Sequence, residues 1–354
     1  MKALWSLIAT TLLPFASVAG NSFFWEPADS RTLFNGELWQ VELADFSPES
    51  YSREVDGLLA DFEEHTGRAL APGKHRLAAL KIYTNSGNGL QTPKGLVIAV
   101  IDALLRRGFR PGEICLIDAK EENLRDAGYL PPLSRMGVEG AYFRNIRVYA
   151  MDNGELESPV WYYESPLPRE FSSPLGRELL RAPVELNPQE ARKSYLPDIL
   201  LEGVDFWINL PVASHHPGTG PSGALVNASL WNITNGTRFF NRPANAPVAV
   251  AEIAAIPELA DSLALNLVSL EHFQYIGGPA FNANYTGSRP EVWMSVDPVI
   301  MDANLVVLLN EYRQGAGFEP FPELPEYVVY AMELGLGNGI AIETRTIHGF
   351  RGDR

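Results

Sequence analysis

The sequence predicts an α/β fold: a predominantly parallel sheet with flanking helices and a hairpin-containing, Pro-rich insertion. Apolar runs that are typical of buried strands alternate with helical patterns, as in the segments 77–83, 93–108 and 114–118. Strand, helix, strand at this spacing is the right-handed crossover that joins neighbouring parallel strands. A change of composition between residues 129 and 195 predicts the insertion.

The first crossover is the clearest part of the pattern. "RLAALKIYTN" contains a buried strand over Leu77–Tyr83, and "EICLID" contains a second strand over Ile114–Asp118. Between them, apolar residues recur three or four apart from Leu96 to Leu105, and Gly108 follows them, which predicts a helix and its end. A short acidic helix is expected at 121–127.

The middle of the chain differs in character. Aromatic and β-branched runs flank Asp152-Asn153-Gly154, which is a strong signal for a β-hairpin turn. Prolines at positions 159, 166, 168, 174, 183 and 188 favour irregular structure after it. We therefore place an insertion at about 129–195.

The α/β pattern then resumes. Apolar runs predict strands at Val204–Leu210, Leu263–Leu270 and Val292–Val296, all of which we expect in the parallel core. Helices are expected at 246–256, 298–315 and 325–337. Asp297 and Pro298 occupy the N-cap and first position of the second of these helices, where both residue types are favoured.

The first 19 residues have the three parts of an export signal. Lys2 precedes an apolar run over 3–15, and Ser17-Val18-Ala19 fits a signal-peptidase site. The run is shorter than the ~20 residues that a membrane-spanning helix needs. We expect residues 1–19 to be removed, residues 20–354 to form one large domain with an insertion, and the protein to be periplasmic or secreted, with no integral membrane segment after cleavage.

Charge and cysteine content exclude several classes of function. Without Lys2 the chain has 27 basic and 43 acidic residues, a net charge of -16, whereas nucleic acid and anionic membranes bind basic surfaces. The single cysteine, Cys115, excludes an internal disulfide and an iron–sulfur cluster with four thiolate ligands. A small-molecule or metal ligand remains the expected partner.

The segment "NLPVASHHPGTGPSGALVN", residues 209–227, follows a predicted strand. Ligands of parallel α/β sheets bind outside the carboxyl ends of the strands, so this loop is the candidate lining of a cleft. His215 and His216 are candidate catalytic bases or metal ligands, although adjacent side chains on an extended chain point to opposite sides. Thr219 and Ser222 add hydroxyls, and Asn227 adds an amide.

Other polar residues are expected at the ends of strands or the starts of helices. Lys81 and Asn85 lie at the end of the first strand, and Asp297 and Asp302 lie at the start of a helix. Lys81 is a candidate catalytic residue, and the other three are candidate ligand-binding residues, although capping alone accounts for Asp297. Glycosylation sequons begin at Asn227, Asn232, Asn235 and Asn284. We interpret them as an amide-rich lining, with glycosylation as the alternative.

Several short motifs occur in an order that resembles the Domain of Unknown Function 362 family. They lie between Leu77 and Gly339 and read "LKIYTN", "TPKGLVIAVIDALLRRG", "ICLID", "DFWINLPVASHHPGTGPSGALVN", "VWMSVDPVIMDANLVVLL" and "AMELGLGNG". The resemblance implies site positions at Lys81, Thr92-Pro93, Pro211 with His215 or His216, Asn227, and Asp297-Pro298 with Asp302. The chain departs from the family pattern at Tyr83, where an asparagine is usual, and at Val226, where a lysine is usual.

The loop is also similar to the histidine and small-residue loop of lactate-racemase-type enzymes, which attach a nickel pincer cofactor to a lysine. Leu225 and Val226 stand where a lysine would be needed, so we expect no covalent nickel pincer. Two functions remain open. One is an exported α/β protein that binds a small molecule or metal in a cleft lined by residues 211–227 and has an undefined enzymatic reaction. The other is a noncatalytic periplasmic or secreted binding protein.

Overall fold

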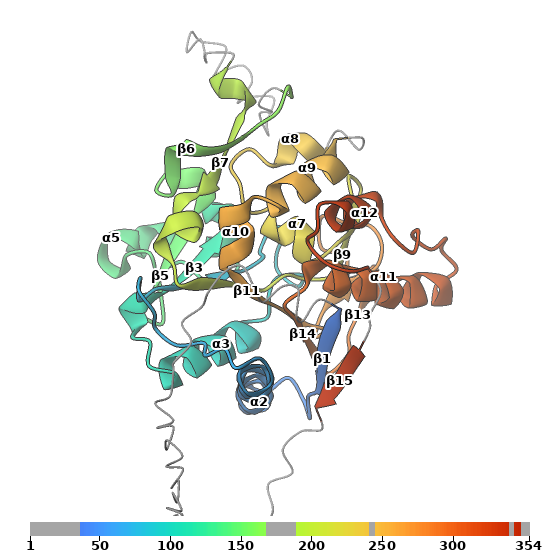
Figure 1. The fold of residues 1–354 in the computed structure, drawn as a ribbon, viewed down its shortest axis with the longest axis horizontal. Coiled ribbons are helices and arrows are strands. Elements are labelled where there is room, and N and C mark those ends of the chain that lie inside the picture. Colours follow the sequence, from blue (N-terminus) through green and yellow to red (C-terminus); the bar gives the residue numbers. More distant parts are fainter. Residues whose placement is uncertain (1–35, 168–188, 241–244, 340–342, 348–354) are drawn as a thin grey trace, which may run out of the picture.

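The computed structural model describes residues 36–167, 189–240, 245–339 and 343–347. Its centre is a nine-stranded sheet in the order β15-β1-β14-β11-β8-β2-β3-β5-β4 (Figure 1). The strands are β1 (Glu37–Glu42), β2 (Ala78–Lys81), β3 (Ile114–Asp118), β4 (Tyr142–Phe143), β5 (Ile146–Ala150), β8 (Phe206–Asn209), β11 (Leu263–Ser269), β14 (Glu291–Ser295) and β15 (Glu343–Ile347). The predicted export segment, residues 1–19, lies outside the described residues.

The middle of the sheet is parallel, as predicted. β11, β8, β2, β3 and β5 pair in parallel with one another. The strand predicted at 292–296 forms as β14, but it runs antiparallel to both β11 and β1, so its placement in the parallel core was wrong. The connection that leads to β14 explains its direction, because a strand that runs parallel to the preceding one needs a crossover connection, usually a helix. The chain between β11 and β14 instead forms two short strands, β12 (Phe273–Gln274) and β13 (Thr286–Gly287).

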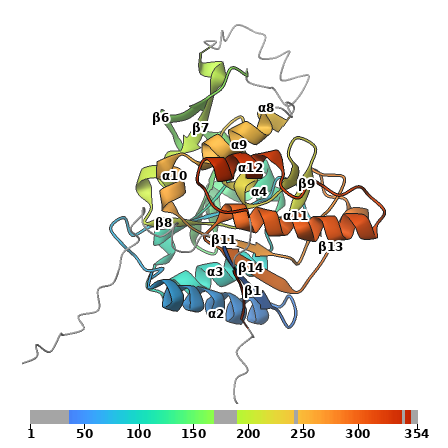
Figure 2. The same cartoon turned by 45° about the vertical axis from the view of Figure 1, so that its right-hand side comes forward.

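Helices cover both faces of the sheet. α2 (Pro48–Thr66) and α3 (Lys94–Arg106) lie together on one face, and most of the remaining helices lie on the other (Figure 2). The remaining helices are α4 (Glu121–Asp126), α5 (Met136–Glu139), α7 (Ala224–Ala228), α8 (Thr237–Phe240), α9 (Ala246–Ala254), α10 (Pro257–Ser262), α11 (Pro298–Gly315) and α12 (Glu326–Glu333). Among the described helices, none is both long enough and apolar enough to cross a membrane.

The two helical layers enclose separate apolar clusters. Along β2, Leu80 packs in the cluster under α2 and α3, whereas Ala79 packs in the cluster under α9 and α12. Successive side chains of a strand point to opposite faces. Lys81 therefore lies on the same face as Ala79, towards the α9 and α12 layer.

The hairpin predicted around Asp152–Gly154 does not form. The strand before the turn, β5, joins the central sheet beside β3, although it lies within the predicted insertion at 129–195. The strand after the turn, β6 (Glu157–Glu164), pairs with β7 (Lys193–Pro197) in a separate two-stranded sheet. The turn therefore connects two sheets rather than two paired strands. Most of the proline-rich segment, residues 168–188, lies outside the described residues.

Candidate functional site

The loop after β8 is folded and packed. It contains β9 (Ser214–His216) and β10 (Gly220–Ser222), which pair with each other in a four-stranded sheet with β12 and β13, and it ends in α7. Between residues 211 and 227 only Pro217 is exposed. Residues 211–227 thus form a covering layer over the carboxyl edge of the central sheet.

The two histidines point to different surroundings, as their adjacency predicts. His215 is half-buried and stacks on Phe321, and its Nδ1 accepts a hydrogen bond of 3.2 Å from the Gly278 N–H. His216 is buried against Phe240, and its Nδ1 accepts a bond of 3.0 Å from the Gly218 N–H. Burial lowers the pKa of His216 to about 4, so this ring is neutral at pH 7.

These hydrogen bonds limit what either histidine offers to a metal. A neutral imidazole whose Nδ1 accepts a hydrogen bond carries its proton on Nε2, so neither nitrogen has a spare lone pair. The described part of the chain also contains no group of three or more His, Cys, Asp or Glu side chains arranged to hold a metal ion.

Lys81 lies in a closed ion pair. Its Nζ is 2.8 Å from Asp118 Oδ1 and also donates to the Ile82 carbonyl at 2.7 Å and to Asn227 Oδ1 at 3.1 Å. Both charged side chains are fully buried. Burial lowers the pKa of Lys81, and the Asp118 carboxylate opposes that shift. All three N–H donors of the ammonium are thus occupied by protein acceptors.

Asn85 belongs to the same cluster, because its amide donates to Asp118 Oδ1 at 3.3 Å. Thr84 Oγ1 donates to the other carboxylate oxygen at 2.5 Å, and the Ala119 N–H donates to Oδ1 at 2.7 Å. Three of the candidate residues, Lys81, Asn85 and Asn227, therefore lie in one cluster, in which Asp118 at the end of β3 binds Lys81 and Asn85, and Lys81 binds Asn227.

From Lys81 a row of polar side chains continues across the sheet. Lys81 pairs in register with Asn209, Asn209 with Asn266, and Asn266 with Ser295. Asn227 donates to Asn209 Oδ1 at 2.7 Å, and Asn209 donates to Asn266 Oδ1 at 2.9 Å. Asn227 is 1% exposed, so the folded protein hides this sequon from glycosylation. This buried polar row fastens α7 to the sheet.

Asp302 and Asp297 accept hydrogen bonds from backbone N–H groups. Asp302, on α11, accepts from the N–H groups of Ala224 at 2.5 Å and Leu225 at 3.0 Å, at the start of α7. Burial raises its pKa to about 7 against the lowering effect of these bonds. Asp297 caps α11 by accepting from Val299 at 2.8 Å and from Ile300 at 3.0 Å. The predicted capping role of Asp297 is confirmed.

Thr219 and Ser222 are also buried within the layer. Thr219 is 9% exposed and Ser222 is 4% exposed, and Ser222 pairs in register with Ser214. Neither lines the cavities described below. Lys81, Asn85, Asn227 and Asp302 thus gather at the carboxyl edge of the sheet, where they bind one another, Asp118 and the backbone. The buried Thr219 hydroxyl has no hydrogen-bond partner among the described residues.

A cavity of about 200 Å³ opens beside this edge, at the carboxyl ends of β3 and β5. Ala119 follows β3 directly, and Asp152 lies two residues after β5. The polar side chains that line the cavity include those of Lys120, Asp152, Glu157, Trp231, Asn235 and Thr237. The turn at one wall is closely packed, because a Cβ on Gly236 would lie 2.0 Å from the Leu230 carbonyl oxygen.

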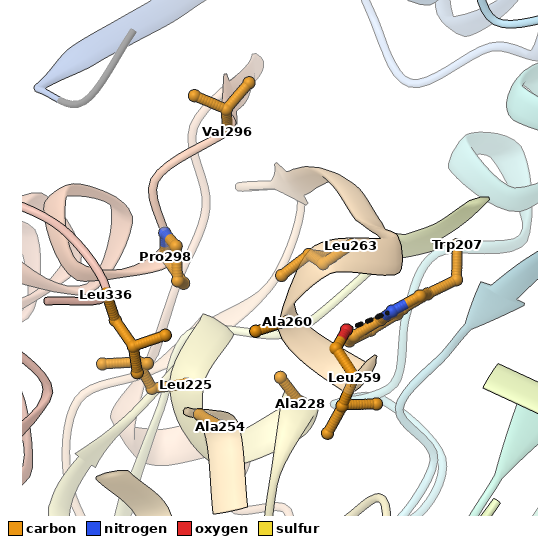
Figure 3. Close-up of a pocket in the computed structure, with 10 residues that line it drawn as sticks. All are labelled: Trp207, Leu225, Ala228, Ala254, Leu259, Ala260, Leu263, Val296, Pro298 and Leu336. Carbon is orange, nitrogen blue, oxygen red and sulfur yellow. Dashed lines mark hydrogen bonds between the residues drawn. The ribbon is translucent and has the colours of Figure 1, made fainter. Parts of the chain in front are cut away.

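Two other cavities differ in size and position. An apolar crevice of about 20 Å³ lies between α7, α10 and the start of α11, next to the hydrogen bond from Trp207 to the Leu259 carbonyl (Figure 3). It has room for about one water molecule. A polar cavity of about 590 Å³, lined by residues such as Lys74, Glu202 and Glu258, lies at the opposite edge of the sheet, where β8 begins.

The sequence analysis missed most residues of the 200 Å³ cavity, although it interpreted the sequon at Asn235 as part of an amide-rich lining. Lys120 and Asp152 follow the ends of two parallel strands, which is the signal that identified Lys81 and Asn85. Asp152 was overlooked because the segment before it was assigned to a hairpin. Trp231 and Asn235 come three and seven residues after the end of α7, beyond the predicted 211–227 lining.

The fold defines the class of the molecule, which is an α/β protein with a large, mainly parallel central sheet. No protein-family model and no curated protein matches the chain. Among solved structures it is similar to a Thermotoga maritima protein determined by the Northeast Structural Genomics Consortium, with a TM-score of 0.34 and 14% sequence identity. The match covers 64% of this chain and 51% of that protein.

Proposed function

We propose that this chain is an exported small-molecule-binding protein of the Domain of Unknown Function 362 type, and that its ligand occupies the cavity at the carboxyl ends of β3 and β5. The position of that cavity carries the proposal. Ligands of parallel α/β sheets bind at this edge, because the loops that leave the strands there converge around one space. The proposed site therefore lies next to the predicted 211–227 lining.

The make-up of the cavity supports a small polar ligand. Its volume of about 200 Å³ is below the ~300 Å³ at which pockets for drug-sized ligands begin. Leu230 and Ile233 supply apolar contacts, while Lys120 and Asp152 supply opposite charges. Apolar walls with a few convergent polar groups are typical of small-molecule sites.

The state of Lys81 supports binding without turnover. A catalytic lysine needs a free or freely exchanging amine, whereas the Lys81 ammonium is fully buried and has protein acceptors for all its donors. His216 is likewise enclosed by Phe240. These contacts favour the noncatalytic binding protein over the enzyme.

The test is native mass spectrometry on protein purified from its own exported form. We expect a retained small molecule in the wild type and its loss in Thr237→Trp, which fills the cavity from its half-buried rim. Glu202→Trp places the same side chain at the opposite cavity and is the matched control, expected to retain the molecule. If Glu202→Trp removes the molecule while Thr237→Trp keeps it, the ligand binds at the opposite edge and the proposed site is wrong.

A further inference from the structure

Two buried N–H donors on side chains that line the 200 Å³ cavity have no acceptor. They are the indole Nε1 of Trp231 and the amide Nδ2 of Asn235, and neither has a hydrogen-bond partner among the described residues. Trp231 is 5% exposed. Buried donors are nearly always paired in folded proteins, so two orphans beside one cavity indicate a missing acceptor.

Lys120 adds a positive charge to the same cavity. Its side chain is half-buried and forms no close salt bridge within the described part of the chain, although its charge acts on the Asp152 carboxylate across the same cavity. A cation and two N–H donors together favour a carboxylate, which accepts several hydrogen bonds and carries the opposite charge.

Two acidic side chains complete the lining. Asp152 and Glu157 are exposed at the rim, and the Asp152 carboxylate accepts a hydrogen bond of 3.0 Å from the Glu121 N–H. With Lys120 they leave a net charge of -1, so the lining attracts a cation as well as a carboxylate. An anion that lacks a positive group would be repelled by the rim.

We propose that the ligand is a small zwitterion of amino-acid size, and this inference rests on the proposed binding function of the same cavity. Its carboxylate binds the donors of Trp231, Asn235 and Lys120. Its ammonium faces Asp152 and Glu157 at the rim. The apolar part of the molecule packs on Leu230 and Ile233.

Calorimetric titration with matched probes tests this assignment. The panel contains α-, β- and γ-amino acids with apolar chains, each with the amine that lacks its carboxylate and the acid that lacks its ammonium. We expect the tightest probe to be an amino acid, with its amine and its acid each binding at least ~10-fold more weakly, since each loses one charged contact. The inference is overturned if an amine or an acid binds as tightly as the best amino acid.

Single variants then test which side chains bind the carboxylate of the ligand and which bind its ammonium. Trp231→Phe keeps the ring and removes the N–H, so it should weaken the amino acid and the acid by ~5-fold or more and leave the amine unchanged. Asp152→Asn should weaken the amino acid and the amine and spare the acid. Asp126→Asn, an exposed change on α4 outside the lining, is the control and should change none of them. Equal effects of Trp231→Phe on all three probes would contradict the assigned orientation.

The panel also separates this inference from the proposed function. If an acid or an amine binds best and Thr237→Trp abolishes that binding, the cavity is a binding site but its ligand is not a zwitterion. If no probe binds, or if binding survives in Thr237→Trp, the zwitterion assignment fails. The proposed function then fails as well if native mass spectrometry shows no retained molecule that depends on Thr237.

Discussion

Replacing Lys81 with methionine tests whether this residue is structural. The change keeps most of the side-chain volume but removes the ammonium that is 2.8 Å from Asp118 Oδ1. Asp118 then stays fully buried without a cation, and the Ile82 carbonyl and Asn227 Oδ1 each lose a donor. Breaking a buried ion pair by removing one partner costs about 3–5 kcal/mol. The bonds from Thr84 and Asn85 remain, so we expect about 3 kcal/mol.

Equilibrium unfolding in urea measures this cost. Lys120→Met is the matched control, because Lys120 is half-buried and forms no close salt bridge within the described residues. We expect it to change the unfolding free energy by less than about 1 kcal/mol. Adding Asp118→Asn to Lys81→Met should recover part of the loss, since it removes the uncompensated charge. A loss below about 1 kcal/mol for Lys81→Met would refute the structural interpretation of the buried pair.

Three further predictions concern stability and processing. The raised pKa of Asp302, about 7, means that the folded state holds this proton more tightly than the unfolded state. The wild type should therefore lose stability relative to Asp302→Asn as the pH rises from about 4 to 7, by up to about 4 kcal/mol of unfolding free energy. If urea unfolding shows the same difference between the two proteins at every pH in that range, the prediction is contradicted. His216→Ala removes a buried ring and should cost about 1–3 kcal/mol, whereas His215→Ala, at a half-buried ring, should cost less; equal denaturant midpoints would show that the two surroundings are equivalent. N-terminal sequencing of the mature protein should begin at Gly20 or Asn21, and an intact Met1 would exclude cleavage.

Local patterns were enough to predict most of the central sheet. The segments assigned to β2, β3, β8 and β11 are apolar on both faces, and only buried parallel strands need that. The N-cap of α11 could also be predicted, because Asp297 and Pro298 favour the start of a helix through contacts with neighbouring backbone atoms. The direction of β14 was not readable, since it depends on what the chain does between residues 269 and 291.

The candidate site was predicted only in part, for a physical reason. Strand order brings Lys81 to Asp118, and the loop after β8 brings Asn227 to the same ammonium. The sequence placed these residues at strand ends or in that loop, but it did not predict these two contacts. Small residues made the 211–227 segment resemble an open loop, but they also allow close packing. A Cβ on Gly218, for example, would lie 2.6 Å from the Phe240 carbonyl oxygen. Small residues are therefore compatible with both an open loop and a closely packed segment, and the sequence did not distinguish between the two.

A crystal structure of the exported protein with its retained molecule tests the central claim most directly. The account predicts ligand density in the cavity at the ends of β3 and β5, with a ligand oxygen within hydrogen-bond distance of Trp231 Nε1 and Lys120 Nζ. Ligand density in the 590 Å³ cavity near Glu202, with the cavity beside Trp231 empty, would contradict it.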